Sequence, residues 1–401
     1  MSYDVAALRA AYPSLASGIA HFDSASGTQT PRAVGEAIAR TITGPLSYRG
    51  RLSRPEANAE ATVLRFRKAY AALLNADPAG IVFGRSATQL TYDFSHHLSA
   101  GWGPGDEVVV TRLEHDANVR PWVQAAQRTG ASIRWIDFDP QTGELDVAGG
   151  LALLNDRTRL VAVTAASNLL GTGVPVAQLA SAAQRAGATV WVDAVHYAAH
   201  RLVDLGALRA DVVVCSPYKF LGPHCAVLAA DPALLDGLRP DKLVPSPDTV
   251  PERFEYGTLP YEVLAGATAA VDFLAGIDPG PGATRREHLE HSFASIHEHE
   301  TRLRDWIEQE VLRLPGVTCH SRAADRTPTL LLTIEGRQMA AAYSFLVHLG
   351  VLCPAGSFYA HEPWQRLGLP DTAGLRIGLA PYSNSDDAAR LVDGLRAFVA
   401  Q

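Results

Sequence analysis

The sequence offers few amino groups for chemistry, because Lys68, Lys219 and Lys242 are its only lysines among 35 basic residues. Lys68 lies in a helical stretch beside arginines and Lys242 in a polar loop, so both are expected at the surface. Lys219 instead follows the apolar run 211–216, which is typical of a buried strand. Open α/β sheets bind ligands beyond the carboxyl ends of their strands. Burial there lowers the pKa of an amine, which can then act as nucleophile and base.

A carboxylate is expected near this lysine. Asp193 ends the run 188–192, which has the pattern of a buried strand, and a carboxylate there is costly unless it faces a cation or hydrogen-bond donors. Asp193 and Lys219 are one strand–crossover–strand unit apart, so both can reach the same crevice. Pyridoxal phosphate requires this pair, since the amine forms a Schiff base and the carboxylate keeps the pyridine nitrogen protonated.

The phosphate of such a cofactor needs its own binding site. Residues 80–83 predict a strand, 84–86 a turn and 87–90 the first turn of a helix, whose free N–H groups would point at an anion. An ordinary capped helix start has the same letters, so the pattern alone leaves both interpretations open.

The wider pattern predicts an α/β fold. Short β-branched runs alternate with helical periodicity such as that of 175–185, which is typical of a parallel sheet with crossover helices. These runs are 107–111, 132–136, 160–165, 189–192 and 211–215. Beyond residue 260 the pattern changes to that of a smaller α+β domain. It has helices at 264–274, 285–314 and 385–400 and strands at 329–334 and 375–379.

Composition narrows the class of function. The 401 residues are 47% hydrophobic and 19% charged, with a net charge of −7, which indicates a globular chain with a small-molecule substrate and no nucleic-acid partner. No apolar run approaches the roughly 20 residues of a membrane helix, so no membrane association is expected. The four cysteines, Cys215, Cys225, Cys319 and Cys353, are scattered, which favours a cytoplasmic protein without disulfides.

Several segments resemble group II cysteine desulfurases. Residues 113–122, LEHDANVRPW, resemble their E-H-x-A-N-x-x-P-W segment, and residues 166–172 resemble S-N-x-x-G-T. Four more segments follow in register: 192–196 (V-D-x-A-Q in the family), 216–219 (S-x-H-K), 253–258 (R-F-E-x-G-T) and 374–377 (the C-terminal arginine strand). The chain therefore resembles the class V aminotransferase superfamily of fold type I, in its desulfurase-like branch, from about Phe22 to the end.

The resemblance implies a fold, a cofactor and roles for single residues. The fold would be a large domain, 22–262, with a mainly parallel seven-stranded sheet, and a small α+β domain from 1–21 and 263–401. The implied cofactor is pyridoxal 5′-phosphate. Lys219 would carry it and move the substrate's Cα proton, Asp193 would pair with its ring nitrogen, and His115 would stack on the ring and act as acid or base. Asn168, and His196 in place of the family's glutamine, would bind the phenolic oxygen.

The resemblance also implies a shared site in a homodimer. The residues expected at the phosphate are Ala87, Thr88, Ser216 and Tyr218, with Thr258 reaching over from a second subunit. Arg376 would grip the substrate carboxylate through two parallel hydrogen bonds. Arg49 or Arg51 would contact substrate at the entrance, and exposed loop charge is the alternative.

One position departs from the family. Desulfurases use a loop cysteine to accept sulfur, but in the segment 353–360 that position belongs to Tyr359, and Cys353 lies six residues earlier. We therefore expect a carbon–sulfur lyase that eliminates a thiol from cysteine or a cysteine S-conjugate, with Tyr359 near the substrate. Such an enzyme would fit secondary metabolism.

Other outcomes remain open at this point. They are aminotransfer, epimerisation, decarboxylation, desulfuration through Cys353, and a cofactor-binding homologue without turnover. The spacing of His196 and His200 suits a metal, but no helix-borne glutamate accompanies it, so no metal is expected. The histidines His288, His291, His297 and His299 lie among acids on a predicted solvated face.

Overall fold

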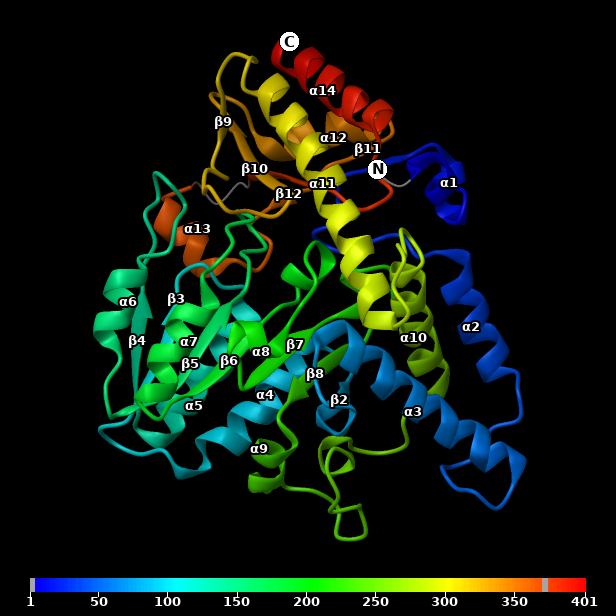
Figure 1. Cartoon of the computed structure of the whole chain (residues 1–401). Helices are drawn as coiled ribbons and strands as arrows, with labels where there is room; N and C mark the ends of the chain where they lie inside the picture. Colours follow the sequence, from blue (N-terminus) through cyan, green and yellow to red (C-terminus); the bar gives the residue numbers. More distant parts are fainter. Residues whose placement is uncertain (1–3, 370–373) are drawn as a thin grey trace.

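The computed structural model describes residues 4–369 and 374–401. Within these ranges the central sheet has seven strands in the order β2-β8-β7-β6-β5-β3-β4 (Figure 1). Only β8 runs antiparallel to its neighbours, so the sheet is mainly parallel, as predicted. Its strands are β2 (Ile81–Gly84), β3 (Glu107–Thr111), β4 (Ser132–Ile136), β5 (Thr158–Thr164), β6 (Thr189–Asp193), β7 (Val212–Cys215) and β8 (Ala226–Ala230).

Helices cover both faces of this sheet. Alternate strand residues pack on α3, α7 and α10 on one face and on α4 and α5 on the other, because successive side chains of a strand point to opposite faces. With both faces covered, nearly every residue of the strands other than the edge strand β4 is buried, which explains the continuous apolar runs. The helices of this part are α2 (Arg32–Ile42), α3 (Arg54–Leu74), α4 (Ala87–Leu98), α5 (Arg120–Thr129), α6 (Val147–Leu153), α7 (Val176–Arg185), α8 (Leu205–Leu208), α9 (Pro232–Gly237) and α10 (Tyr261–Ala275).

The C-terminal part contains an antiparallel sheet, which among the described residues has four strands in the order β12-β13-β10-β9. The short β1 pairs in parallel with β11 and so ties the N-terminal segment to this part. The strands are β1 (Ala20–His21), β9 (Val317–Cys319), β10 (Thr329–Ile334), β11 (Val351–Leu352), β12 (Ala355–Gly356) and β13 (Gly374–Gly378). The helices outside the large layer are α1 (Val5–Arg9), α11 (Arg285–Val311), α12 (Met339–His348), α13 (His361–Leu367) and α14 (Ser385–Val399).

The long helix α11 joins the two parts (Figure 1). Its first half packs into the core of the large layer through Leu289 and Ile296, and its second half packs into the C-terminal core through Ile307 and Val311. The domain boundary expected at residue 263 falls inside α10, which packs against α2 and α3 of the large layer. No helix among the described residues combines the length and hydropathy that a membrane crossing requires.

Candidate active site

A cavity opens beyond the carboxyl ends of β5, β6 and β7. Most of the predicted site residues lie together in its wall: Ala87, Thr88, His115, Asn168, Asp193, His196, Ser216, Tyr218 and Lys219. They come from separate strands and helices, and the parallel topology brings them to one edge of the sheet. The cavity therefore has the position and the donor set expected of a ligand site.

Lys219 ends a short 3-10 turn (Pro217–Lys219) that follows β7. Its Nζ donates to the carbonyl oxygen of Ala25 at 2.5 Å. Burial, and then the positive charge of Arg376, lower the pKa of this amine to about 7, against an opposing effect of Asp193. A large fraction of the amine is consequently neutral near pH 7, as a nucleophile or general base requires.

Asp193 is the last residue of β6 and is buried. One carboxylate oxygen accepts the backbone N–H of Val195 at 2.8 Å. Burial raises the pKa of Asp193 to about 6, although that hydrogen bond and the charge of Lys219 act in the opposite direction. A protonated ring nitrogen placed against it would restore the ionised form, because an opposite charge nearby lowers a carboxyl pKa.

The imidazole of His115 is fixed from two sides. Its Nδ1 accepts the backbone N–H of Ala117 at 3.1 Å, which places the ring proton on Nε2. The ring of Tyr359 stacks on it with a centroid distance of 5.6 Å and an interplanar angle of 27°. Burial lowers the pKa of His115 to about 4, so the ring is neutral at physiological pH. A neutral, flat ring in the cavity wall suits stacking against another aromatic ring.

The anion end of the cavity is the start of α4. Ser86 caps this helix, with its hydroxyl accepting the N–H of Gln89 at 3.1 Å. The N–H groups of Ala87 and Thr88 lie in the first turn of the helix, where no preceding turn supplies a carbonyl acceptor. They are therefore available to a phosphate. Thr258 lines a separate hollow together with Arg85 and Gln89. Its action from a second subunit stays a prediction.

Arg376, on β13, lies in a second, wider cavity that also reaches Lys219. Its guanidinium donates to the carbonyl oxygen of Asn168 at 2.9 Å and to Oγ of Ser26 at 2.5 Å. The ring of Phe358 covers it, with the centroid 3.8 Å from Cζ. Burial lowers the pKa of Arg376 to about 9. The arginine is thus held rigidly beside the lysine, as recognition of an α-carboxylate requires.

Arg49 makes different contacts. It donates to Glu60 at 2.7 Å and to Glu252 at 2.8 Å, and these hydrogen bonds raise the pKa of Arg49. Neither of the two cavities includes it. Its expected contact with substrate also stays a prediction.

Several wall residues lie outside the sequence-based prediction, among them Ser26, Ser86, Tyr92, Thr164 and Phe358. Phe358 and Tyr359 both have φ of 56°, in the left-handed region that non-glycine residues rarely adopt. No pattern in the letters signals this backbone turn, which directs one ring to Arg376 and the other to His115.

Asn168 provides a direct test of whether the cavity fits a polar ligand. Its amide nitrogen donates to the carbonyl oxygen of Phe358 at 3.0 Å, but its Oδ1 is buried with no hydrogen-bond partner among the described residues. A buried polar atom without a partner is costly, so the site is complete only with a ligand. Beside this atom, Lys219, Asp193 and the start of α4 provide the amine, the carboxylate and the free N–H groups that pyridoxal 5′-phosphate requires.

Comparison with known proteins agrees with this site. The model of the family described as Aminotransferase class-V matches residues 20–391, and the chain belongs to that family. It is 32% identical over 404 residues to the uncharacterized protein MT3887 of Mycobacterium tuberculosis, with 99% of this chain and 100% of that protein covered. It is 29% identical to a cysteine desulfurase of Cronobacter sakazakii, with 98% of each chain covered. The crystal structure of the Escherichia coli cysteine desulfurase CsdA superimposes with a TM-score of 0.87 at 25% identity, covering 99% of this chain and 98% of that one.

Members of this family are enzymes that bind pyridoxal 5′-phosphate and act on small amino-acid substrates. The enzyme class and the cofactor predicted from Lys219 and Asp193 are thereby confirmed. The roles of individual residues and the particular reaction stay predictions.

Proposed function

We propose that this enzyme is a carbon–sulfur lyase that eliminates a thiol from cysteine or, preferentially, from a cysteine S-conjugate. One observation carries the proposal: the residue in the sulfur-accepting loop position is Tyr359, and all four cysteines of the chain are buried. A phenol cannot accept sulfur as a thiolate does. The site keeps the means to break a carbon–sulfur bond but has no group to carry the sulfur away.

Cys353 is the alternative sulfur carrier, and its surroundings argue against that role. The side chain is fully buried, and its Sγ donates to the carbonyl oxygen of Arg376 at 3.5 Å. Burial raises the pKa of this thiol far above its usual range, so the reactive thiolate is not formed. Cys353 lines neither cavity, whereas Lys219 and Arg376 line the wider one together.

The residues present are suited to each part of an elimination. When bound, the cofactor supplies an electron sink for the charge that develops at Cα. Arg376 binds the substrate's α-carboxylate and so fixes the amino acid beside Lys219. The neutral amine of Lys219 then accepts the Cα proton. Asp193, against the ring nitrogen, keeps the sink cationic.

The elimination balances without an oxidant or an enzyme nucleophile. The Cα–H bond gives its proton to Lys219, the Cβ–S bond breaks with its electron pair on sulfur, and the thiolate takes up a proton. The remaining 2-aminoacrylate reacts with water to give pyruvate and ammonia. The wider cavity extends past Lys219 to Tyr92, Pro121 and Tyr359, whose side chains could pack against an apolar substituent on sulfur. This part of the wall supports an S-conjugate as the preferred substrate.

The test is to incubate the holoenzyme with free cysteine and with aryl and alkyl cysteine S-conjugates, following pyruvate, thiol and the cofactor spectrum together. We expect pyruvate and thiol in equal amounts, faster from conjugates, and unchanged in Cys353→Ser. Alanine with sulfur transferred to an acceptor would identify a desulfurase. Accumulated pyridoxamine phosphate would identify an aminotransferase, and loss of optical rotation without ammonia an epimerase. No reaction with any amino acid would identify an inactive homologue.

We also propose that the enzyme is a homodimer, because family members are typically dimeric. In that assembly Thr258 and Arg49, which line neither cavity of their own chain, would serve the partner's site. Sedimentation equilibrium gives the oligomeric state. Complementation then tests the sharing: mixing inactive Lys219→Ala with inactive Thr258→Val subunits should restore one intact site per mixed dimer.

A further inference from the structure

His196 occupies the position at which the family's segment has glutamine, and it is held by hydroxyl groups from the C-terminal part of the chain. Its Nε2 lies 2.8 Å from Oγ1 of Thr327 and 3.2 Å from Oγ1 of Thr329. All three residues are buried, and His196 also lines the cofactor cavity. Because Nε2 faces the two threonines, Nδ1 is the ring nitrogen left for a ligand.

Counting protons decides which ring nitrogen carries the hydrogen. The hydroxyl of Thr329 is buried, and Nε2 of His196 is its only hydrogen-bond contact among the described residues. Were Nε2 protonated, this hydroxyl proton would be buried without an acceptor, which is costly. The Thr327 hydroxyl has a second acceptor, the carbonyl oxygen of Gly171 at 3.2 Å, so it does not constrain the ring. The Thr329 hydroxyl has no such alternative, so Nε2 accepts its proton and Nδ1 carries the ring proton.

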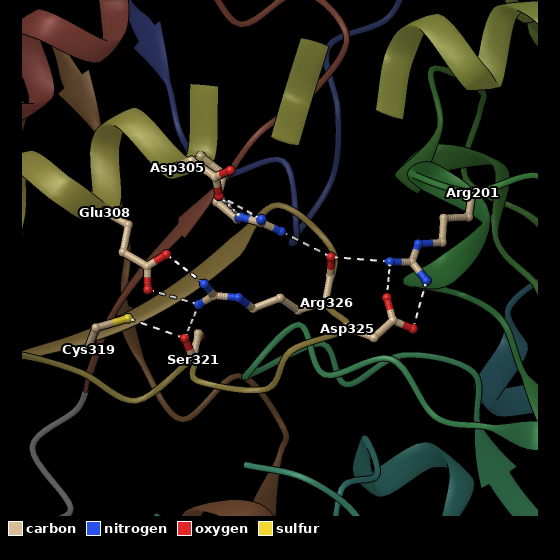
Figure 2. Close-up of polar contacts among 8 residues, drawn as sticks. Arg201, Asp305, Glu308, Cys319, Ser321, Asp325 and Arg326 are labelled. Carbon is tan, nitrogen blue, oxygen red and sulfur yellow. Dashed lines mark hydrogen bonds and ion pairs between the residues drawn. The ribbon is translucent and has the colours of Figure 1, made fainter. Parts of the chain in front are cut away.

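The two residues before Thr327 are each held by an ion pair (Figure 2). Arg326, next to Thr327, makes two parallel bonds to Glu308 of α11 at 2.9 and 2.7 Å. Asp325 pairs with Arg201, which follows the His196 turn. These ion pairs tie the segment before Thr327 to α11 and to the turn after His196.

A second contact holds the imidazole ring from the side. His200 packs edge-on against His196, with a centroid distance of 5.0 Å and an interplanar angle of 65°. Nδ1 of His200 lies 2.9 Å from Oε2 of Glu300 on α11. Glu300 thus anchors His200, and His200 blocks rotation of the His196 ring away from the threonines.

We propose that Thr329, with Thr327 beside it, is a positioning residue that fixes the tautomer of His196, so that its Nδ1–H is donated to the phenolic oxygen of the cofactor. The threonines do not touch the cofactor and act only through the imidazole. The proposal rests on the cofactor site and not on the lyase reaction, so either can fail without the other.

The first test uses Thr329→Val, which removes the hydroxyl that constrains Nε2 and keeps the shape. We expect the pH midpoint of the bound cofactor's visible absorption band to rise by about one unit, and cofactor affinity to fall roughly tenfold, as for loss of one hydrogen bond to a charged oxygen. The midpoint rises because the deprotonated chromophore carries more negative charge on the phenolic oxygen. Thr329→Ser should restore wild-type behaviour. The matched control is Thr333→Val, since Thr333 is also on β10 and its hydroxyl also contacts a histidine, His320, at 2.9 Å.

A Thr329→Val spectrum and affinity equal to those of wild type would overturn the proposal, as would an equal change in Thr333→Val. The second test needs no stable variant. In ¹⁵N-histidine-labelled holoenzyme, the His196 resonances, identified by their loss in His196→Gln, should show a protonated Nδ1 and an unprotonated Nε2. The opposite tautomer would overturn the proposal.

Discussion

The reactivity of Lys219 towards the cofactor gives the sharpest prediction of the site. Its pKa of about 7, against an ordinary value of 10.5, makes about half of the amine neutral at pH 7. With an ordinary pKa only about 3 amines in 10,000 would be neutral, so the cavity increases the reactive form by roughly a thousandfold. The difference corresponds to about 5 kcal/mol, which derives first from burial and then from the charge of Arg376.

The assay is the rate at which apoprotein forms its visible absorption band with pyridoxal 5′-phosphate, measured by stopped flow from pH 5.5 to 10. The rate should rise with pH through a midpoint near 7 and then level off, because only the neutral amine attacks the aldehyde. Arg376→Met removes the second cause, so the midpoint should move upward but stay below 10. Lys219→Ala is the blank. A wild-type midpoint near 10 would refute the burial argument, and an unmoved midpoint in Arg376→Met would refute the share assigned to that arginine.

Three other predictions follow from single contacts. Arg376→Lys should raise KM for the amino acid by about 100-fold with a smaller change in kcat, because a lysine cannot reproduce the guanidinium fork; an unchanged KM in steady-state kinetics would contradict this. Cys353→Ser should leave pyruvate production intact and cost about 1 kcal/mol of stability in urea unfolding, since the thiol is buried but not reactive; lost activity in the folded variant would restore the desulfurase alternative. Burial raises the pKa of Glu114 to about 8 from 4.5, so its contribution to stability is present below pH 4.5 and is lost as pH rises towards 8. In urea titrations, the free energy of unfolding of the wild type should fall by on the order of 3 kcal/mol between pH 5 and pH 8, and that of Glu114→Gln should lack this fall. Parallel pH profiles of the two unfolding free energies would count against the assignment.

Much of the fold was accessible from the sequence because buried parallel strands have a simple signature. The runs of β3, β6 and β7 are continuous and apolar since helices cover both of their faces. The antiparallel β8 was not predicted, because its letters, AVLAA, suit a helix equally well. The assignment of α10 to the large layer depends on contacts with α2 and α3, which no local pattern encodes.

The site was predictable where chemistry restricts the residue type. The chain has only three lysines, and few carboxylates end a buried strand, so the sequence alone indicates Lys219 and Asp193. Both line the cavity. Thr327 and Thr329 lie before and at the start of β10, and nothing in their sequence marks them; only tertiary packing brings their hydroxyls to His196. The left-handed turn at Phe358 and Tyr359 is likewise stabilised by distant partners, Arg376 and His115. The homodimer, the cytoplasmic location and the roles of Thr258 and Arg49 stay predictions.

The central claim is that the ε-amino group of Lys219 holds the cofactor covalently. Borohydride reduction of the purified yellow holoenzyme, followed by proteolysis and mass spectrometry, tests it directly. The account predicts a reduced pyridoxyl group on the peptide that contains Lys219 and on no other. A modified Lys68 or Lys242 with Lys219 unmodified, or a visible band that survives borohydride, would contradict it.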